Sequence, residues 1–281
     1  MKQKVSDYIA EYIAQWGIRD VFTVTGGGAM HMNDAFGHHK MLHCTYQHHE
    51  QACAMAAEAY ARLGNKMAAV CVTTGPGATN AITGVLGAWM DSIPMLVFSG
   101  QARYATTVSA SGLPLRSMGV QECNIVPVVK SLTKYAHMIV HPENIRYHLE
   151  KALYLAVNGR PGPVWLDIPL DVQGAVIETD DLKAYDPEEN PEQQPREIKD
   201  ETVEQILDKL QESKRPVLSP GNGVRLAGAH EDFYQLAELL GVPVVTGMSS
   251  VDAIESDHPL FVGRSGGTGT RPGNFALQNS D

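Results

Sequence analysis

Short apolar runs alternate with helical segments over residues 1–172, and this alternation limits the fold more than any other feature. The runs at 21–24, 67–73 and 94–99 are rich in Val and other apolar residues, whereas residues 5–16 place apolar side chains at i, i+3 and i+4. Strands that are apolar throughout are covered on both faces, as in parallel sheets flanked by helices. The sequence therefore predicts an α/β fold, with a parallel sheet and helices on both of its faces, over residues 1–172.

An acidic stretch that contains prolines interrupts this pattern. Residues 178–201 include ten Asp and Glu but only three Lys and Arg, and Pro187, Pro191 and Pro195 lie among them. Such a stretch has too few apolar residues to form a core of its own. We therefore expect an exposed linker over residues 173–199.

A second, Rossmann-like α/β unit is expected over residues 200–281. A helix to about Ser213 precedes a predicted strand at 216–218, and a helix ending at Leu240 precedes a predicted strand at 242–246. A sheet usually has about five or six strands. Two clear strands therefore predict a central domain that is truncated.

Charge and composition exclude several classes of protein. The chain has 32 Asp and Glu against 22 Lys and Arg, which disfavours binding to the phosphate backbone of nucleic acids. No stretch reaches the roughly 18 apolar residues of a membrane span, so we expect a cytoplasmic protein without a membrane anchor. The four cysteines lack CxxC spacing and the histidines lack carboxylates at ligand spacing, so we expect no metal site in this chain.

Glycine-rich loops and one carboxylate follow the predicted strands. Gly26, Gly27 and Gly28 come after the first strand, a Thr-Thr-Gly-Pro-Gly sequence follows the run at 67–73, and Glu50 opens an alanine-rich helix. Taken singly, the glycines would be tight turns and Glu50 a surface carboxylate at a helix N-terminus. Because ligands of parallel sheets bind at the carboxyl ends of the strands, their common position favours a binding site.

Six blocks in order along the chain resemble the acetolactate synthase family of thiamine diphosphate enzymes. They are His49-Glu50-Gln51 with Ala59-Tyr60-Ala61-Arg62, Thr74-Gly75-Pro76-Gly77-Ala78-Thr79-Asn80, Asp91-Ser92-Ile93-Pro94 with Ser99-Gly100-Gln101, Gly159-Arg160-Pro161-Gly162-Pro163 with Asp167-Ile168-Pro169-Leu170-Asp171, Gly241-Val242-Pro243-Val244-Val245 with Asp257-His258-Pro259-Leu260, and Gly269-Thr270-Arg271-Pro272-Gly273-Asn274. The resemblance implies a pyrimidine-binding domain over residues 1–172, followed by part of a central domain.

The resemblance also implies roles for individual residues. Glu50 matches the family's catalytic glutamate, which holds a proton at the aminopyrimidine ring of thiamine diphosphate. Gln121 matches a glutamine near the substrate. The implied cofactor-binding residues are Gly26, Gly27, Gly28, Pro76 and Asn80.

The reaction implied is decarboxylation of a 2-oxo acid such as pyruvate, followed by carboligation of the acyl unit. Val120 stands where synthases of the family usually have Phe, and residues 111–118 look like an extra segment. These departures leave the acceptor open, and acyl transfer to another ketone, such as a keto-sugar nucleotide, is an alternative. A non-catalytic or regulatory subunit is a third reading.

Further partners follow from the resemblance alone. The family binds the diphosphate through Mg²⁺ on a third, C-terminal domain that begins a loop with Gly-Asp-Gly, and that tripeptide does not occur in these 281 residues. A homodimer or homotetramer is implied. Bound FAD is left open: Arg160 and Arg271 match flavin-contacting stretches, but a purely structural arginine is an equal alternative for Arg160.

Overall fold

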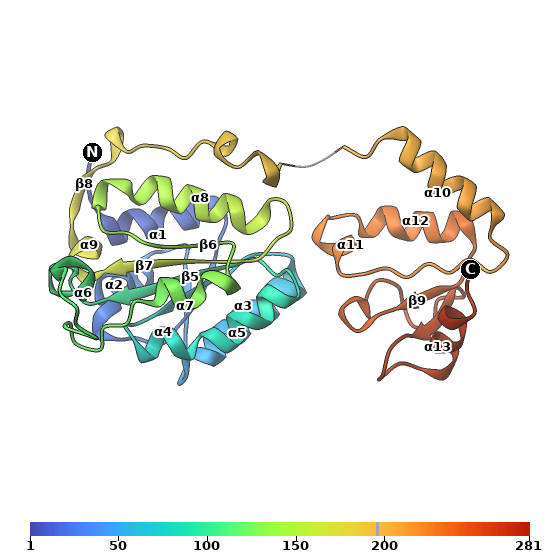
Figure 1. Cartoon of the computed structure of the whole chain (residues 1–281), viewed down its shortest axis with the longest axis horizontal. Helices are drawn as coiled ribbons and strands as arrows, with labels where there is room; N and C mark the ends of the chain where they lie inside the picture. The colour runs from blue at the N-terminus through green and yellow to red at the C-terminus, as the bar shows by residue number, and fades with distance from the viewer. Residues whose placement is uncertain (195–196) are drawn as a thin grey trace. The chain divides into compact units, whose positions relative to one another are not determined.

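The computed structural model of this protein describes residues 1–194 and 197–281. The chain forms two compact units, Met1–Pro195 and Arg196–Asp281 (Figure 1). Pro195 and Arg196, which the expected linker included, lie outside the described residues.

A six-stranded sheet forms the centre of the first unit. Its strands run in the order β3-β2-β4-β5-β7-β6, and every neighbouring pair is parallel. The two seven-residue strands near the middle, β5 and β7, are buried along their whole length, as their apolar sequences predict. The strands are β2 (Asp20–Thr23), β3 (His43–Tyr46), β4 (Ala69–Val72), β5 (Met95–Gln101), β6 (Tyr135–Met138) and β7 (Pro163–Pro169).

Helices cover both faces of this sheet, which confirms the expected parallel α/β fold (Figure 1). One face carries α1 (Val5–Trp16), α2 (Met30–His38), α8 (Ile145–Val157) and α9 (Leu170–Gly174), and the other carries α3 (Glu50–Gly64), α4 (Pro76–Asn80), α5 (Ile82–Met90) and α7 (Ile125–Val129). The apolar spacing over about 78–89 predicts a single helix, but the structure has two, α4 and α5, which meet at Ala81. The first begins at Pro76 because proline suits the first turn of a helix.

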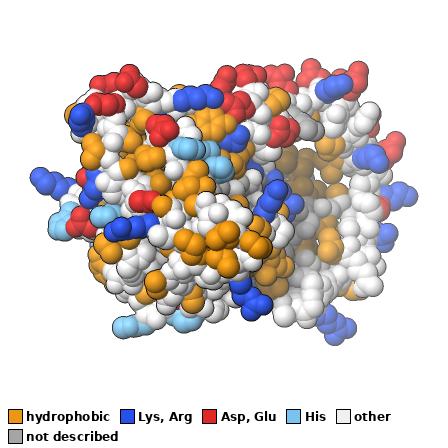
Figure 2. All heavy atoms as spheres, turned by 60° about the vertical axis from the view of Figure 1, so that its left-hand side comes forward, with side chains coloured by type: hydrophobic (Ala, Val, Ile, Leu, Met, Phe, Trp, Pro, Cys, Tyr) orange, Lys and Arg blue, Asp and Glu red, His pale blue; other side chains and the backbone are white. Residues whose placement is uncertain are grey.

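The expected linker is not exposed along its whole length. The short strand β8 (Val176–Glu178) pairs antiparallel with β1 (Lys2–Lys4), and Leu182 and Tyr185 are buried against the first unit. We call residues 176–194 the strap; acidic side chains gather along the top of the molecule, where it runs (Figure 2). Because the strap is acidic on average, its composition does not reveal the single apolar side chains, Leu182 and Tyr185, that are buried.

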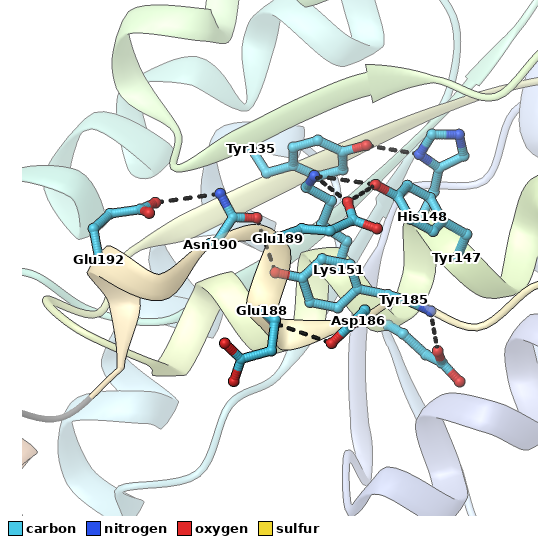
Figure 3. Close-up of polar contacts among 11 residues, drawn as sticks. Tyr135, Tyr147, His148, Lys151, Tyr185, Asp186, Glu188, Glu189, Asn190 and Glu192 are labelled. Atoms are coloured by element: carbon cyan, nitrogen blue, oxygen red, sulfur yellow. Dashed lines mark hydrogen bonds and ion pairs between the residues drawn. The ribbon is translucent and has the colours of Figure 1, made fainter.

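An aromatic cluster holds the strap near its middle. Tyr135, Tyr147 and Tyr185 surround the ammonium group of Lys151, whose Nζ lies 5.3–5.7 Å from the three ring centres (Figure 3). Lys151 Nζ also lies 3.6 Å from a carboxylate oxygen of Glu189 in the strap. Cation–π contacts and this ion pair therefore join the strap to α8 and β6.

The second unit is smaller and has a short sheet. Strands β9 (Val244–Thr246) and β10 (Phe261–Arg264) pair in parallel, and the strand expected at 216–218 reduces to a single bridge between Leu218 and Val244. The sequence reading missed β10. The helices are α10 (Asp200–Glu212), α11 (Gly223–Leu226), α12 (His230–Leu240) and α13 (Arg271–Gln278), and the small core contains Phe233, Ala237, Val244, Ala253 and Ile254.

Within the described residues, no helix combines the length and apolar character needed to cross a lipid bilayer.

Candidate functional site

At the carboxyl edge of the sheet, the edge at which the parallel strands end, glycines of the loop after β2 pack against threonine side chains of the loop after β4. Gly28 donates its N–H to Thr73 Oγ1 at 3.0 Å. A Cβ atom placed on Gly28 would lie 1.8 Å from Thr74 Oγ1, and one on Gly26 would lie 2.5 Å from Thr73 Cβ. Of the three glycines predicted from the sequence, Gly26 and Gly28 therefore allow the close approach of these two loops, whereas a Cβ atom on Gly27 would meet nothing within 4 Å.

The loop after β5 reaches the same place. Gly75 has φ +58°, a left-handed conformation that favours glycine, and a Cβ atom there would lie 2.1 Å from the backbone oxygen of Gln121. Gln121 itself has φ +56°. Pro76 follows at once as the first residue of α4. The structure therefore brings Gln121 beside the Gly-Pro-Gly loop.

Glu50 is the first residue of α3 and points at this junction. Its Oε2 accepts a hydrogen bond of 2.9 Å from Asn80 Nδ2, at the end of α4. A Cβ atom on Gly77 would lie 3.4 Å from Glu50 Oε1 and 2.7 Å from the methyl group of Thr73, so glycine lets α4 pack closely beside the carboxylate. The side chain of Glu50 is half-buried. The amide of Asn80 therefore fixes the direction in which the carboxylate points.

The neighbourhood of Glu50 explains why α3 starts here. His49 Nδ1 accepts the N–H of Gln51 at 3.1 Å and caps the helix, and a carboxylate in the first turn interacts favourably with the helix dipole. One turn later, burial and then the charge of Glu50 raise the pKa of the Cys53 thiol to about 12. That thiol stays neutral and serves as a small apolar side chain.

Comparison with known proteins identifies this arrangement of domains. The family described as "Thiamine pyrophosphate enzyme, N-terminal TPP binding domain" matches residues 3–123, and "Thiamine pyrophosphate enzyme, central domain" matches residues 203–281. The chain belongs to the thiamine pyrophosphate enzyme family. Thiamine pyrophosphate is the same compound as thiamine diphosphate, so the resemblance seen in the sequence is confirmed.

Three relatives show the extent of the similarity. The chain is 34% identical to acetolactate synthase 2, chloroplastic, of Zea mays, over 99% of the chain and 42% of that protein. It is 35% identical to the acetolactate synthase large subunit of Corynebacterium glutamicum (93% and 40%) and 32% identical to that of Lactococcus lactis subsp. lactis (98% and 46%). The chain thus spans less than half the length of the curated relatives it matches.

The carboxyl edge of this thiamine pyrophosphate enzyme fits the aminopyrimidine half of the cofactor. It offers a half-buried carboxylate that Asn80 orients and that has a glycine, Gly77, close beside it. Among residues 1–194 and 197–281, no group of three or more His, Cys, Asp and Glu side chains is placed to hold a metal ion.

The two arginines matched to flavin contacts belong to different units of the chain. Arg160 is in the turn before β7, at the amino edge of the sheet, and its Nε donates to Ser92 Oγ at 2.7 Å. It lines a cavity of about 380 Å³ together with Trp89, Lys134 and Glu192. Burial lowers the pKa of Lys134 to about 8, against the raising effect of Glu192. Arg271 opens α13 in the second unit and is exposed.

The sequence reading missed a buried polar network below the junction. Asp167 in β7 accepts from Ser99 Oγ at 2.6 Å and from Gln101 Nε2 at 3.1 Å. Gln101 Nε2 also donates to the backbone oxygen of Cys123 at 2.8 Å. Complete burial raises the pKa of Asp167 to about 7, against the lowering effect of the two hydrogen bonds. The motif Asp167-Ile-Pro drew attention to this residue, but only the register between β5 and β7 shows its partners.

A second missed residue, Glu122, organises the loop that leads to Gln121. Its carboxylate accepts backbone N–H groups of Val108, Met118 and Gly119 at 2.7–2.9 Å. Burial would raise its pKa, but these three hydrogen bonds outweigh burial and lower it. The loop that contains the expected extra segment, 111–118, is therefore folded around one carboxylate.

Proposed function

We propose that this chain provides the pyrimidine-binding part of an acetolactate synthase-like enzyme. The reaction is thiamine diphosphate-dependent decarboxylation of a 2-oxo acid such as pyruvate, with carboligation of the resulting acyl unit. The observation that carries the proposal is the carboxylate of Glu50, held by Asn80 at 2.9 Å beside the glycine loops. The identity of the relatives as acetolactate synthases supports the choice of reaction.

Each residue of the junction has a defined task in this proposal. When bound, thiamine diphosphate supplies the electron sink for decarboxylation. Glu50 holds a proton at the aminopyrimidine ring, and Asn80 keeps the carboxylate aimed at that ring. Gly26, Gly27 and Gly28 allow the ring and the substrate to approach the backbone, and Pro76 fixes the first turn of α4.

The acceptor is assigned to the loop that ends at Gln121. Pyruvate is the acceptor in the first form of the proposal, and a larger ketone, such as a keto-sugar nucleotide, is the alternative. The alternative rests on the extra segment, residues 111–118, and on Val120, whose side chain is 87% exposed. A short, exposed side chain beside Gln121 leaves more space than the phenylalanine usual in synthases of the family.

The diphosphate and Mg²⁺ are assigned to a further domain, in a homodimer or homotetramer. The chain by itself should bind thiamine diphosphate weakly, because most of the charge of the cofactor lies on its diphosphate. Net hydrogen bonds contribute only about 0.5–1.5 kcal/mol each. Titration calorimetry of the chain with cofactor and Mg²⁺ checks this, and micromolar or tighter binding would contradict it.

Flavin is a separate proposal, supported by the cavity beside Arg160 and Trp89. The residues are compatible with an anionic aromatic ligand, since a guanidinium and an indole ring line the same cavity. An absorbance spectrum of oxidised flavin in the purified complete enzyme would support this assignment. A colourless complete enzyme that turns over without added FAD would remove it.

The decisive experiment follows the fate of pyruvate. Complete enzyme that carries this chain is incubated with thiamine diphosphate, Mg²⁺ and labelled pyruvate, alone and with candidate ketones. Release of CO₂ with formation of a new carbon–carbon bond is expected, and mass spectrometry of the product identifies the acceptor. Cofactor binding without CO₂ release would instead favour the non-catalytic subunit.

A further inference from the structure

A glutamine in α9, a helix that packs against α2, reaches the glycine loop after β2. Gln173, in α9, is fully buried, and its Nε2 donates at 2.7 Å to the backbone oxygen of Gly28 and at 2.7 Å to that of Ile168. Gly28 and Gln173 are 145 residues apart in the chain. One amide group therefore ties the glycine loop to the end of β7.

The orientation of this amide is determined by its partners. Both nearby groups are carbonyl oxygens, which accept hydrogen bonds, so the NH₂ end of the side chain must face them. Within the described part of the chain, Gln173 Oε1 has no hydrogen-bond partner although it is buried. A buried acceptor without a partner costs free energy. The side chain is thus placed for its two donor hydrogens.

The peptide groups of Gly28 are held from two directions. Its N–H donates to Thr73 Oγ1 at 3.0 Å, and its carbonyl accepts from Gln173. A Cβ atom on Gly100 would lie 2.0 Å from that carbonyl oxygen, so β5 also presses against it. The glycine loop consequently has little freedom to turn its carbonyl away.

We propose that Gln173 is a positioning residue that fixes the glycine loop for the aminopyrimidine and the substrate. The proposal rests on the proposed function in assigning the loop to the cofactor, but the contact itself is independent of that assignment. Loss of the two donors should release the carbonyl of Gly28 and let the loop after β2 move.

Hydrogen exchange of the chain tests the contact without any catalytic assay. In Gln173→Met, which keeps the length but has no donor, amides of residues 24–32 should exchange at least tenfold faster, while α8 should stay as in wild type. Thr133→Val is the matched control, because it removes a buried 2.9 Å hydrogen bond to a backbone carbonyl far from the loop. Unchanged exchange at 24–32, or equal acceleration everywhere, would overturn the proposal.

A second variant covers the case in which Gln173→Met does not fold. Gln173→Asn keeps the amide but is one methylene shorter, so it cannot reach both carbonyl oxygens. Selective acceleration at residues 24–32 supports the proposal here too, and uniform or absent acceleration overturns it.

Kinetics of the complete enzyme then test the consequence for the cofactor. Gln173→Met should raise the thiamine diphosphate concentration for half-maximal activity at least tenfold, and Gln173→Glu, which donates one hydrogen when protonated, should lie between it and wild type. Wild-type affinity in Gln173→Met, with faster exchange at 24–32, would reject the positioning role. A wild-type enzyme that never turns over would reject the proposed function and leave the exchange result standing.

Discussion

The two edges of the six-stranded sheet differ in how closely the groups at each edge are packed. At the carboxyl edge, glycines pack against threonine side chains and backbone oxygens at contacts too close for a further side chain, and Gly75 has a left-handed conformation. At the amino edge, the side chains of Trp89, Lys134 and Arg160 line an open cavity. A backbone junction has few alternative arrangements, whereas a cavity lined by long side chains can adjust. The difference suggests that exact geometry is needed at the carboxyl edge and adaptable binding at the amino edge.

Removing the carboxylate of the carboxyl edge gives the largest effect. In the complete enzyme, Glu50→Gln should lower turnover by about a thousandfold, since positioned proton transfer contributes typically about 10²–10⁴-fold. The amide has the shape of the carboxylate but does not exchange the proton. Steady-state rates at saturating cofactor measure the loss.

Glu58→Gln is the matched control for this variant, because Glu58 is on the same helix and pairs with Arg62 rather than with Asn80. It should keep turnover within about threefold of wild type, while the loss of one part-buried ion pair lowers the free energy of unfolding. Retention of more than a tenth of the rate in Glu50→Gln would move the proton-holding role elsewhere.

The network below the carboxyl edge should make stability depend on pH. The pKa of Asp167 is raised from its ordinary 3.8 to about 7, so the unfolded chain loses this proton at lower pH than the folded chain. The free energy of unfolding should therefore fall between about pH 4 and pH 7, by up to about 4 kcal/mol, and level off above. Urea unfolding of wild type and Asp167→Asn across this range isolates the contribution.

The slope should be smaller in Asp167→Asn, which has no proton to release. The same pH dependence in variant and wild type would assign it to other carboxyl groups.

A side chain added at the backbone junction should be costly. Gly75→Ala places a methyl group against the backbone oxygen of Gln121 and forces alanine into φ +58°. Strain and overpacking together should lower the free energy of unfolding by about 3 kcal/mol. Gly64→Ala is the control, since a Cβ atom there meets nothing within 4 Å. Equal unfolding midpoints for the two variants would show that the structure around Gly75 relaxes to accept a methyl group at little cost in stability.

The amino edge should tolerate change best. Arg160→Met removes one hydrogen bond, to Ser92, and should lower the free energy of unfolding by about 1 kcal/mol or less. Turnover at saturating cofactors should fall by no more than tenfold. A loss as large as that of Glu50→Gln would erase the distinction between the two edges.

The sequence predicted the parts of the fold that repeat a strong pattern. The helix at Val5–Trp16 and the buried strands β5 and β7 follow from periodicity and from long apolar runs. Strand β6 was missed because its side chains are only half-buried, and His137 breaks the apolar run. The strap was misjudged because Leu182 and Tyr185 are isolated among acidic residues, so no local average reveals them.

The sequence predicted those residues of the candidate site that belong to a recognisable local motif. The roles proposed for Glu50, Asn80 and the glycines came from their positions at strand ends and from the family resemblance, and the structure brings Glu50 and Asn80 into contact. Thr73, Gln101 and Gln173 were not predictable, because each acts on a loop far away in the sequence. The contacts of such polar residues become visible only when the strand order is known, because it places loops that are far apart in the sequence next to each other.

The pairing of β1 with β8 has a consequence for the time course of synthesis. The ribosome makes Lys2–Lys4 well before its partner Val176–Glu178 and before Ala175, whose carbonyl accepts the N–H of Val5. At about 5–20 residues per second, the first strand waits for roughly ten to thirty seconds. Until α8 and α9 have been made, the apolar face of α1 lacks the helices that cover it. The growing chain therefore exposes an apolar helix face that chaperones can bind before the first unit has folded.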